Sequence, residues 1–233
     1  MTERRDQIEA GLGRVRERIA TACAEVGREA EEITLVVVTK FFPASDVCLL
    51  ADLGVREVGE NRHQEAVEKA QECSDLGLTW HFIGGLQSNK AAAVASYADV
   101  VQSVDRAKLV SGLSRGAVER GRGLEVLLQV SLDPPDAAGR SGADRGAVPG
   151  ILERVLEADG LVLRGVMGVA PLGGDPGPAF ARLGEVAAEV RTRAPAATWV
   201  SAGMSGDLEE AVRHGATHLR IGSAILGPRP SVK

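Results

Sequence analysis

The sequence is poor in several residue types, and each scarcity argues against a class of protein. Only three cysteines occur, Cys23, Cys48 and Cys73, and no CxxC pair is present. This argues against a disulfide framework or a zinc site and predicts reduced thiols in a cytoplasmic protein. Aromatic residues make up 3% of the chain, so stacking on bases or sugars is not expected. No apolar run approaches the roughly 20 residues of a membrane helix.

Charge is balanced and shows no basic stripe. Lys and Arg number 27 against 32 acidic residues, for a formal net charge of -5, so nucleic acid is not expected as a partner. The first 20 residues are charged and periodic, and they lack the apolar core and cleavage site of a signal peptide. With 233 residues and 44% hydrophobic content, the chain can bury one sizeable core, which favours a single domain over residues 1–233.

The first 30 residues carry the pattern of an amphipathic helix. Apolar residues recur at spacings of three and four on a charged background, which is typical of one buried helix face. They are Ile8, Leu12, Val15, Ile19, Cys23 and Val26. We expect this helix to pack on the domain that follows.

The rest of the chain alternates short apolar runs with helical segments. Strands are predicted at Thr34–Val38, Val55–Val58, Trp80–Ile83, Val100–Val104, Glu125–Val130, Val162–Met167, Trp199–Ser201 and His218–Ile221. Helices are predicted at Ala44–Leu53, Gln64–Gln71, Asn89–Ser96, Arg106–Arg120, Gly146–Ala158, Ala179–Thr192 and Asp207–His214. Eight such repeats favour an α/β fold of the (β/α)₈ TIM-barrel type. An open doubly wound sheet is the alternative, although no GxGxxG opens its first unit.

A lysine ends the first predicted strand, in the stretch ITLVVVTKFFP. Lys40 could be a strand-end lysine whose amine reaches water along its aliphatic stem. Alternatively, burial beside Phe41 and Phe42 would lower the pKa of its amine and make it a Schiff-base nucleophile at the functional end of the barrel. The residues alone favour neither reading. The other four lysines, Lys69, Lys90, Lys108 and Lys233, are expected at solvated positions.

Two loops near the C-terminus have the composition of a phosphate cradle. WVSAGMSGDLEEA follows the seventh predicted strand and RIGSAILG ends the eighth. Small residues let backbone amides approach an anion, and barrels often bind phosphate with these two loops. The alternative is two tight turns with Ser205 as an ordinary helix cap. The candidate residues are Ser201, Gly203, Met204, Ser205, Arg220, Gly222 and Ser223.

Further polar segments follow other strands. GENRHQEA offers Asn61, and HFIGGLQSNK offers His81 and a stretch at 87–89 that could equally cap a helix. We expect His81 to be a core histidine bonded to a backbone carbonyl, in preference to a general base. The long loops 133–144 and 170–179 should lie on the functional face of the barrel. No residue set has metal-ligand spacing, so no metal is expected.

A Schiff-base lysine, a phosphate cradle and a buried arginine together describe a pyridoxal phosphate site. The motifs VVVTKFFPASDV, GENRHQEA, WHFIGGLQSNK, RGVMGVAP and SAGMSGDLEEAVRHGATHLRIGSAILG resemble those of the pyridoxal phosphate homeostasis proteins, which are similar to the N-terminal barrel of alanine racemase. The resemblance covers residues 33–227. It implies that pyridoxal 5'-phosphate is held as an aldimine on Lys40. It also implies that Arg220 faces the ring nitrogen, that Asn61 lines the ring, and that the phosphate lies between the 203–205 and 222–223 segments, with Ser201 also among the binding residues.

The resemblance favours a binding protein over an enzyme. Because arginine only donates hydrogen bonds, Arg220 would keep the ring nitrogen unprotonated and make it a poor electron sink. The only tyrosine, Tyr97, is predicted in a helical segment distant from the motifs, and the chain ends at Lys233 without the second domain that completes alanine racemase. We therefore expect a monomer without catalytic residues that stores pyridoxal phosphate and delivers it to apo-enzymes. A weak amino-acid racemase, a class I aldolase and a merely structural lysine are the alternatives.

Overall fold

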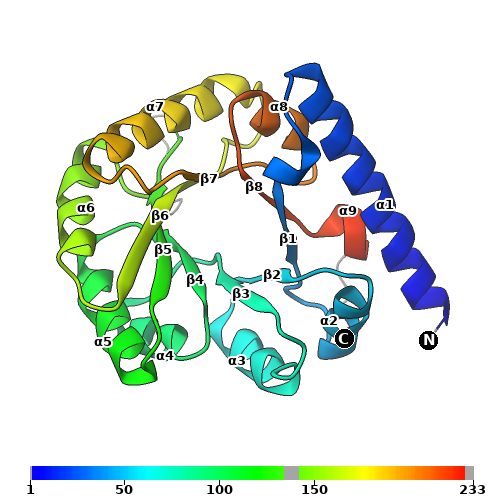
Figure 1. Ribbon diagram of the computed structural model, residues 1–233, viewed down its shortest axis with the longest axis horizontal. Helices are drawn as coiled ribbons and strands as arrows, with labels where there is room; N and C mark the ends of the chain where they lie inside the picture. The colour runs from blue at the N-terminus through cyan, green and yellow to red at the C-terminus, as the bar shows by residue number, and fades with distance from the viewer. Residues whose placement is uncertain (1, 134–141, 229–233) are drawn as a thin grey trace.

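The chain folds into a closed barrel of eight parallel strands, which confirms the predicted TIM-barrel fold (Figure 1). The computed structural model describes residues 2–133 and 142–228. Each strand pairs with the next along the chain, and β8 closes the barrel by pairing with β1. The strands are β1 Thr34–Val38, β2 Glu57–Glu60, β3 Thr79–Phe82, β4 Val100–Val104, β5 Leu124–Val130, β6 Leu161–Gly168, β7 Trp199–Ser201 and β8 His218–Ile221.

Helices surround the barrel on its outer side (Figure 1). They are α1 Thr2–Glu25, α2 Ala44–Asp52, α3 His63–Glu72, α4 Ala91–Ala95, α5 Val110–Arg120, α6 Val148–Leu156, α7 Gly177–Arg193, α8 Leu208–Arg213 and α9 Ser223–Leu226. Four short 3₁₀ helices accompany them: η1 Ala30–Glu32, η2 Ser88–Lys90, η3 Ala107–Leu109 and η4 Arg145–Ala147. No helix in the described part of the chain has the length and apolar content needed to cross a bilayer.

The element bounds follow the sequence pattern closely, with three informative differences. The four strands β1, β4, β7 and β8 have the predicted bounds. β2 begins two residues later than predicted, because the Val55 N–H is used by the end of α2, where it donates to Leu50 O at 2.9 Å. Three predicted helices begin as 3₁₀ turns, and α9, only four residues long, was not predicted because periodicity cannot reveal so short a helix.

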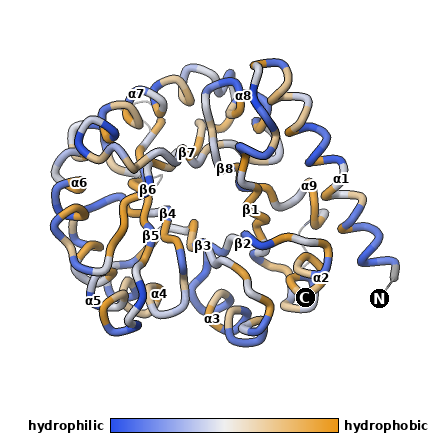
Figure 2. The backbone as a smooth tube through the Cα atoms, viewed as in Figure 1, coloured by the Kyte–Doolittle hydropathy of each residue, from blue (hydrophilic) through white to orange (hydrophobic). Residues whose placement is uncertain are grey.

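Two layers of buried side chains hold the barrel together. The larger lies between the strands and the helices and includes Val37, Leu50 and Leu183, all fully buried. The tube in Figure 2 accordingly alternates hydrophobic and hydrophilic stretches along the surrounding helices. The smaller layer lies inside the barrel, where Val100, Leu127 and Met167 form a separate cluster. The barrel interior is therefore only partly apolar, and polar side chains share the remaining space, as described below.

The N-terminal helix α1 packs on the barrel seam, as expected for residues 1–30. At Gly11 an added Cβ would lie 2.5 Å from Ile225 O, so α1 lies directly against the backbone of α9. Arg4 donates from Nη2 to Leu226 O at 3.1 Å and to the Asp46 carboxylate at 2.5 Å. Arg18 donates to both carboxylate oxygens of Glu209 and, at 3.1 Å, to Ser205 O. One helix thus contacts α2, α8 and α9 together.

Two glycines of α1 allow a matched test of this docking. Gly11→Ala should destabilise the fold by about 1–3 kcal/mol, because the new methyl group must displace backbone at Ile225. Gly13 is exposed and an added Cβ would meet nothing within 4 Å. Gly13→Ala should therefore raise stability by up to ~1 kcal/mol through helix propensity. Urea denaturation of both variants measures the difference, and equal effects of the two substitutions would contradict the packing described here.

Candidate functional site

A cavity of ≈ 270 Å³ opens at the carboxyl ends of the strands, between the loop after β1 and the loops after β7 and β8. It brings together six of the nine predicted site residues. They are Lys40, Met204, Ser205, Arg220, Gly222 and Ser223. Phe41, Phe42 and Ile83 complete much of its apolar wall. A wider hollow of ≈ 710 Å³ adjoins it along α1 and shares Phe42, Ser223 and Gly227 with it.

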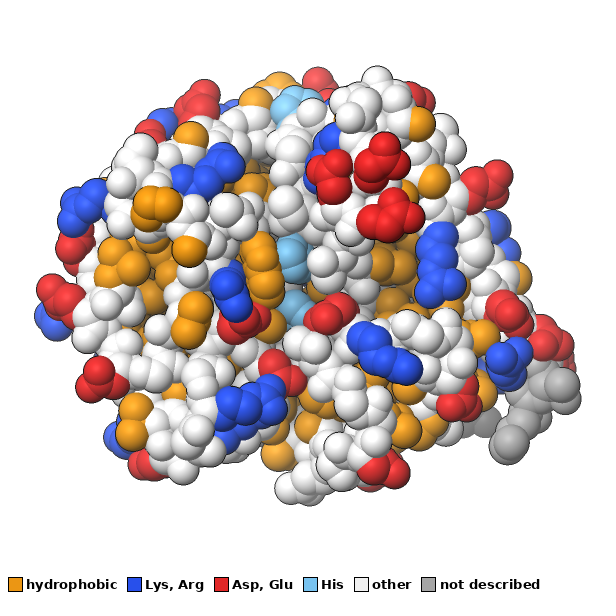
Figure 3. All heavy atoms as spheres, viewed as in Figure 1, with side chains coloured by type: hydrophobic (Ala, Val, Ile, Leu, Met, Phe, Trp, Pro, Cys, Tyr) orange, Lys and Arg blue, Asp and Glu red, His pale blue; other side chains and the backbone are white. Residues whose placement is uncertain are grey.

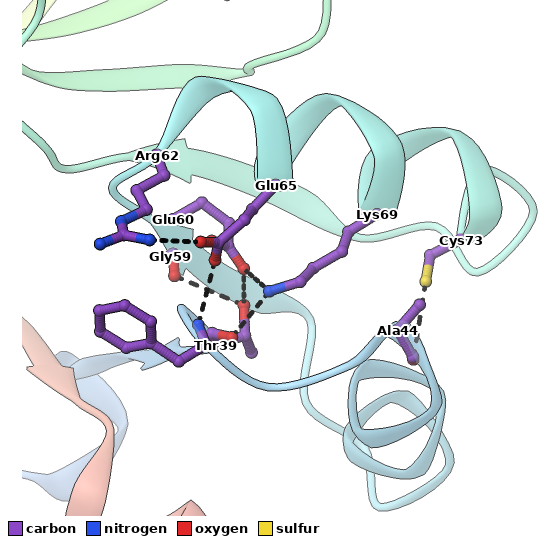
Figure 4. A network of polar contacts seen from close by, with 9 residues as sticks. Thr39, Ala44, Gly59, Glu60, Arg62, Glu65, Lys69 and Cys73 are labelled. Atoms are coloured by element: carbon purple, nitrogen blue, oxygen red, sulfur yellow. Dashed lines mark hydrogen bonds and ion pairs between the residues drawn. The ribbon is translucent and has the colours of Figure 1, made fainter. Parts of the chain in front are cut away.

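The backbone around Lys40 is held from both sides by β2 and α3 (Figure 4). Before the lysine, Thr39 N donates to Gly59 O at 2.9 Å, and Thr39 O accepts from Lys69 Nζ at 2.8 Å. After it, Phe41 adopts φ 70 and donates its N–H to Glu65 Oε2 at 3.2 Å. A positive φ is rare for a bulky residue and marks a turn that its surroundings impose. The half-buried Lys40 side chain is thereby aimed into the cavity.

A buried ion pair supports this turn from behind (Figure 4). Lys69 Nζ lies 2.6 Å from Glu60 Oε1, and the two side chains are only 9% and 1% exposed. Thr39 Oγ1 donates to the same carboxylate oxygen at 2.6 Å. Burial raises the pKa of Glu60, and the Lys69 charge opposes that rise. The expectation that Lys69 is solvated was therefore wrong, since it lies on the inner face of α3.

The two serine-containing loops meet at the cavity wall. Ser223 Oγ donates to Ser205 Oγ at 3.3 Å, and Ala224 N also lies 3.3 Å from Ser205 Oγ. Ser205 is not the cap of the following helix, because the residue that precedes α8 is Asp207. The simple capping interpretation of Ser205 is therefore wrong, and its hydroxyl faces the loop after β8 instead. Two hydroxyls and the first amides of α9 are thus gathered at one place, as anion binding requires.

Gly203 supports this loop without lining the cavity. Its φ is 92, and a Cβ there would lie 2.6 Å from Ala211 Cβ and 2.7 Å from Leu219 Cδ2. Only glycine therefore lets the loop after β7 turn this tightly over β8 and α8. The neighbouring Met204 N donates to Asp207 Oδ1 at 2.6 Å, which fixes the turn from the other side.

Arg220 forms the floor of the cavity. Its side chain is buried, and it donates from Nη1 to Ser201 Oγ at 2.6 Å and from Nη2 to Gly168 O at 2.8 Å. Burial lowers the pKa of Arg220 to about 10, which still leaves the guanidinium charged at neutral pH. Ser201 is completely buried beneath Arg220 and is not among the residues that line the cavity.

Asn61 lies outside this cavity, in a neighbouring hollow of ≈ 420 Å³ that also includes His63, Gln87 and Lys90. Its Oδ1 is buried and has no hydrogen-bond partner among the described residues. Tyr97 lies next to this group, with its ring stacked on His63 at 5.7 Å between centroids. Burial raises the pKa of Tyr97, with a smaller contribution from Glu60. The expectation that Tyr97 is distant from the motifs was therefore wrong, although it does not line the cavity around Lys40.

His81 is buried in the barrel interior but does not bond a backbone carbonyl, so that expectation was also wrong. Its Nε2 lies 2.7 Å from Glu57 Oε2 and its Nδ1 lies 2.8 Å from Gln102 Nε2. Figure 3 shows histidine side chains near the middle of the face in view, with charged side chains around them. Sequence reasoning missed Gln102 entirely. Its signal was present, because a glutamine inside the apolar strand VVQSV must find a partner when buried.

The long loops contribute little that the structure describes. Of the loop 133–144, residues 134–141 fall outside the described residues, and with them Arg140 and Ser141. The loop 170–179 supplies no residue to the cavity. Its Asp175 instead accepts a hydrogen bond at 2.9 Å from the N–H of Gly177, the first residue of α7. The predicted functional role of these loops stays a prediction.

Comparison with known proteins identifies a family that this chain matches. Residues 12–230 match the family model described as alanine racemase, N-terminal domain. A Mycobacterium tuberculosis protein named pyridoxal phosphate homeostasis protein is 44% identical, over 97% of this chain and 95% of that one. A protein of the same name from Escherichia coli K12 is 37% identical, over 96% of this chain and 97% of its own length.

A solved structure agrees with these relatives. PipY of Synechococcus elongatus, determined with PLP bound, superposes with a TM-score of 0.79 at 36% identity. The match covers 90% of this chain and 100% of that one. The likeness therefore extends over most of the chain.

The buried ion pair behind Lys40 generates a prediction about stability and pH. Lys69→Met should lower the free energy of unfolding by roughly 3–5 kcal/mol at neutral pH, because it leaves the Glu60 carboxylate buried and uncompensated. Without Lys69 the raised pKa of Glu60 rises further. A raised pKa means that the folded state holds the proton more tightly, so the deficit should shrink as pH falls toward about 5. Urea denaturation across this range measures it.

Two further variants control this measurement. Lys108→Met removes an exposed lysine and should change stability by less than about 0.5 kcal/mol at any pH. The double variant Glu60→Gln/Lys69→Met removes the uncompensated charge and should recover part of the loss. A deficit in Lys69→Met that is independent of pH and unrelieved by Glu60→Gln would show that the ion pair does not have this role.

Proposed function

The chain belongs to the alanine racemase N-terminal domain family and, within it, to the pyridoxal phosphate homeostasis proteins, and from this premise we propose that it binds pyridoxal 5'-phosphate and keeps it available to other proteins. The observation that carries the proposal is the single cavity that unites Lys40, the Ser205–Ser223 pair and Arg220. Each of the three meets one functional group of the cofactor.

Lys40 supplies the amine for the aldehyde group. Its Nζ would add to the aldehyde carbon, and loss of the oxygen as water would leave a carbon–nitrogen double bond. Phe41, Phe42 and Ile83 form the apolar wall beside this amine. The fixed turn at residues 39–41 sets the point from which the Lys40 side chain leaves the backbone, so little backbone freedom is lost when the bond forms.

The serine pair supplies the phosphate site. Ser205 and Ser223 bring their hydroxyls within 3.3 Å of each other, next to the start of α9. Gly222 lets this segment approach the end of β1 closely, because a Cβ there would lie 3.0 Å from Val38 O. Hydroxyl donors, backbone amides and a close backbone approach are what a phosphate dianion needs.

Arg220 supplies the partner for the ring nitrogen and thereby limits catalysis. The cofactor stabilises carbanions when its ring nitrogen is protonated, and a guanidinium, which only donates, favours the unprotonated nitrogen. Among the described residues that line the cavity, Lys40 and Arg220 are the ionisable side chains. Tyr97, the only tyrosine of the chain, packs against His63 and does not line this cavity. This supports storage and delivery over racemisation.

The proposal extends to the setting in which the protein works. We propose that it acts as a monomer in the cytoplasm and passes the cofactor to apo-enzymes. The reason is chemical. While the aldehyde is bound to Lys40 it is kept from reacting with other amines, and hydrolysis of the carbon–nitrogen bond by water releases it intact.

Absorbance titration with pyridoxal 5'-phosphate tests the site. The unmodified protein should develop a visible imine band, and borohydride reduction should fix the cofactor to Lys40, as located by mass spectrometry of peptides. Lys40→Ala should show neither the band nor the adduct. Lys90→Ala is the matched control, because Lys90 is half-buried like Lys40 but lines the neighbouring hollow, and it should behave as the unmodified protein. An adduct elsewhere, or none, would refute the assignment.

Incubation of the loaded protein with L-alanine separates storage from racemisation. Chiral analysis should find no D-alanine above the rate of free pyridoxal phosphate, because the described residues that line the cavity offer one amine and no carboxyl, imidazole or phenol group as a second acid. Turnover at about 1 per second or faster, the range of ordinary enzymes, would instead establish a racemase.

A further inference from the structure

A continuous chain of hydrogen bonds crosses the barrel interior from the cavity floor to the opposite mouth. Arg220 Nη1 lies 2.6 Å from Ser201 Oγ, and Ser201 Oγ lies 2.7 Å from Gln102 Oε1. Gln102 Nε2 lies 2.8 Å from His81 Nδ1, and His81 Nε2 lies 2.7 Å from Glu57 Oε2. The four inner residues Arg220, Ser201, Gln102 and His81 are all buried, and Glu57 begins β2 at the other end of the barrel.

The two ends of this chain determine the direction of every bond in it. A guanidinium can only donate and a carboxylate can only accept. Ser201 accepts from Arg220, so its one proton goes to Gln102 Oε1. The amide nitrogen of Gln102 must then donate to His81 Nδ1, which leaves the His81 proton on Nε2, facing Glu57. All four donors therefore point the same way, from the cationic end to the anionic end.

These hydrogen bonds also explain how the buried positive charge of Arg220 is stabilised. Within the described residues no carboxylate is paired with the Arg220 guanidinium, which is bonded to a hydroxyl and a carbonyl. Asp207 favours the charge only through space. His218, which lies in the same interior, is no counter-ion, because burial lowers its pKa to about 3. Aligned dipoles that end on Glu57 are thus the most direct connection between Arg220 and a negative charge.

We propose that Ser201, Gln102, His81 and Glu57 are positioning residues that hold Arg220 in one orientation for the ring nitrogen of the cofactor, with the Glu57 carboxylate setting the direction of the relay. This inference rests on the proposed function for the identity of the ligand. The relay, meaning the series of hydrogen bonds from Arg220 to Glu57, consists only of this protein's own residues. It can therefore be tested without any cofactor.

Glu57→Gln is the informative substitution, because it keeps the shape and removes the acceptor-only end. The new amide can present either its oxygen or its nitrogen to His81, so both directions of the relay become possible. Reversal would turn the Gln102 amide nitrogen toward Ser201 and leave the Ser201 proton without an acceptor. Glu125→Gln is the matched control. Glu125 also lies near the start of its strand, β5. Its side chain is 27% exposed, against 29% for Glu57, and it pairs with Arg164, which is not part of the relay.

The first measurement is nitrogen-15 NMR of the His81 ring in the cofactor-free protein. The unmodified protein and Glu125→Gln should show a single neutral tautomer with the proton on Nε2. Glu57→Gln should show a mixture of both tautomers. A fixed Nε2 tautomer in Glu57→Gln would overturn the directing role of the carboxylate, whatever the ligand of the cavity is.

The second measurement is affinity for pyridoxal 5'-phosphate, followed by the imine absorbance. Glu57→Gln and Ser201→Ala should each weaken binding by about tenfold, the effect of losing one hydrogen bond to a charged group, while Glu125→Gln should stay within about twofold. Because both substitutions interrupt one relay, the double variant should be little weaker than either single one. Independent structural damage would multiply instead.

The outcomes separate the two proposals. If the unmodified protein forms no adduct at Lys40, the proposed function fails, and the NMR result still decides whether the relay exists. If the adduct forms with unchanged affinity in Glu57→Gln, or if the two losses multiply in the double variant, the relay is overturned and the binding function stands.

Discussion

The buried guanidinium of Arg220 is the constraint around which the interior of this barrel is arranged. A TIM barrel is ordinarily filled by branched apolar side chains, and here Val100, Leu127 and Met167 fill only part of the space. The remainder is polar because a buried cation needs acceptors. Ser201 and the Gly168 carbonyl provide them directly, and Gln102 and His81 satisfy Ser201 in turn.

A second buried charge is handled differently on the other side of β2. Glu60 and Lys69 pair directly at 2.6 Å in the layer between strands and helices, and the pair also bonds the backbone just before Lys40. Adjacent strand residues point to opposite faces, so Glu57 inside and Glu60 outside serve separate networks from one four-residue strand. β2 therefore contributes both to the hydrogen bonds that lead to Arg220 and to the support of the turn that carries the amine.

Features that depend on the local sequence pattern could be predicted from the sequence. Contacts that depend on which elements meet could not. The strands and the placement of Lys40 at a strand end follow from alternation of apolar runs, and the two serine loops follow from their small residues. Lys69 and Tyr97 were misplaced because a periodic pattern marks a buried face only when that face is apolar. Their polar partners lie on other elements, Glu60 on β2 for Lys69 and His63 on α3 for Tyr97. Likewise, the partners of His81 lie on β2 and β4. Which residues meet inside a barrel depends on the register of several strands, and no single segment of the sequence determines that register.

The cavity also depends on a helix that never enters it. Arg18 of α1 donates to the Ser205 carbonyl, and Arg4 of the same helix donates to Leu226 O at the end of α9. The two halves of the serine pair are thus tied, through their backbones, to one rigid rod. Because Arg4 also bonds Asp46 at the start of α2, the loop that carries Lys40 is tied to the same rod. α1 therefore helps to fix the separation between amine and anion site, together with the hydrogen bonds by which β2 and α3 hold the turn at Lys40.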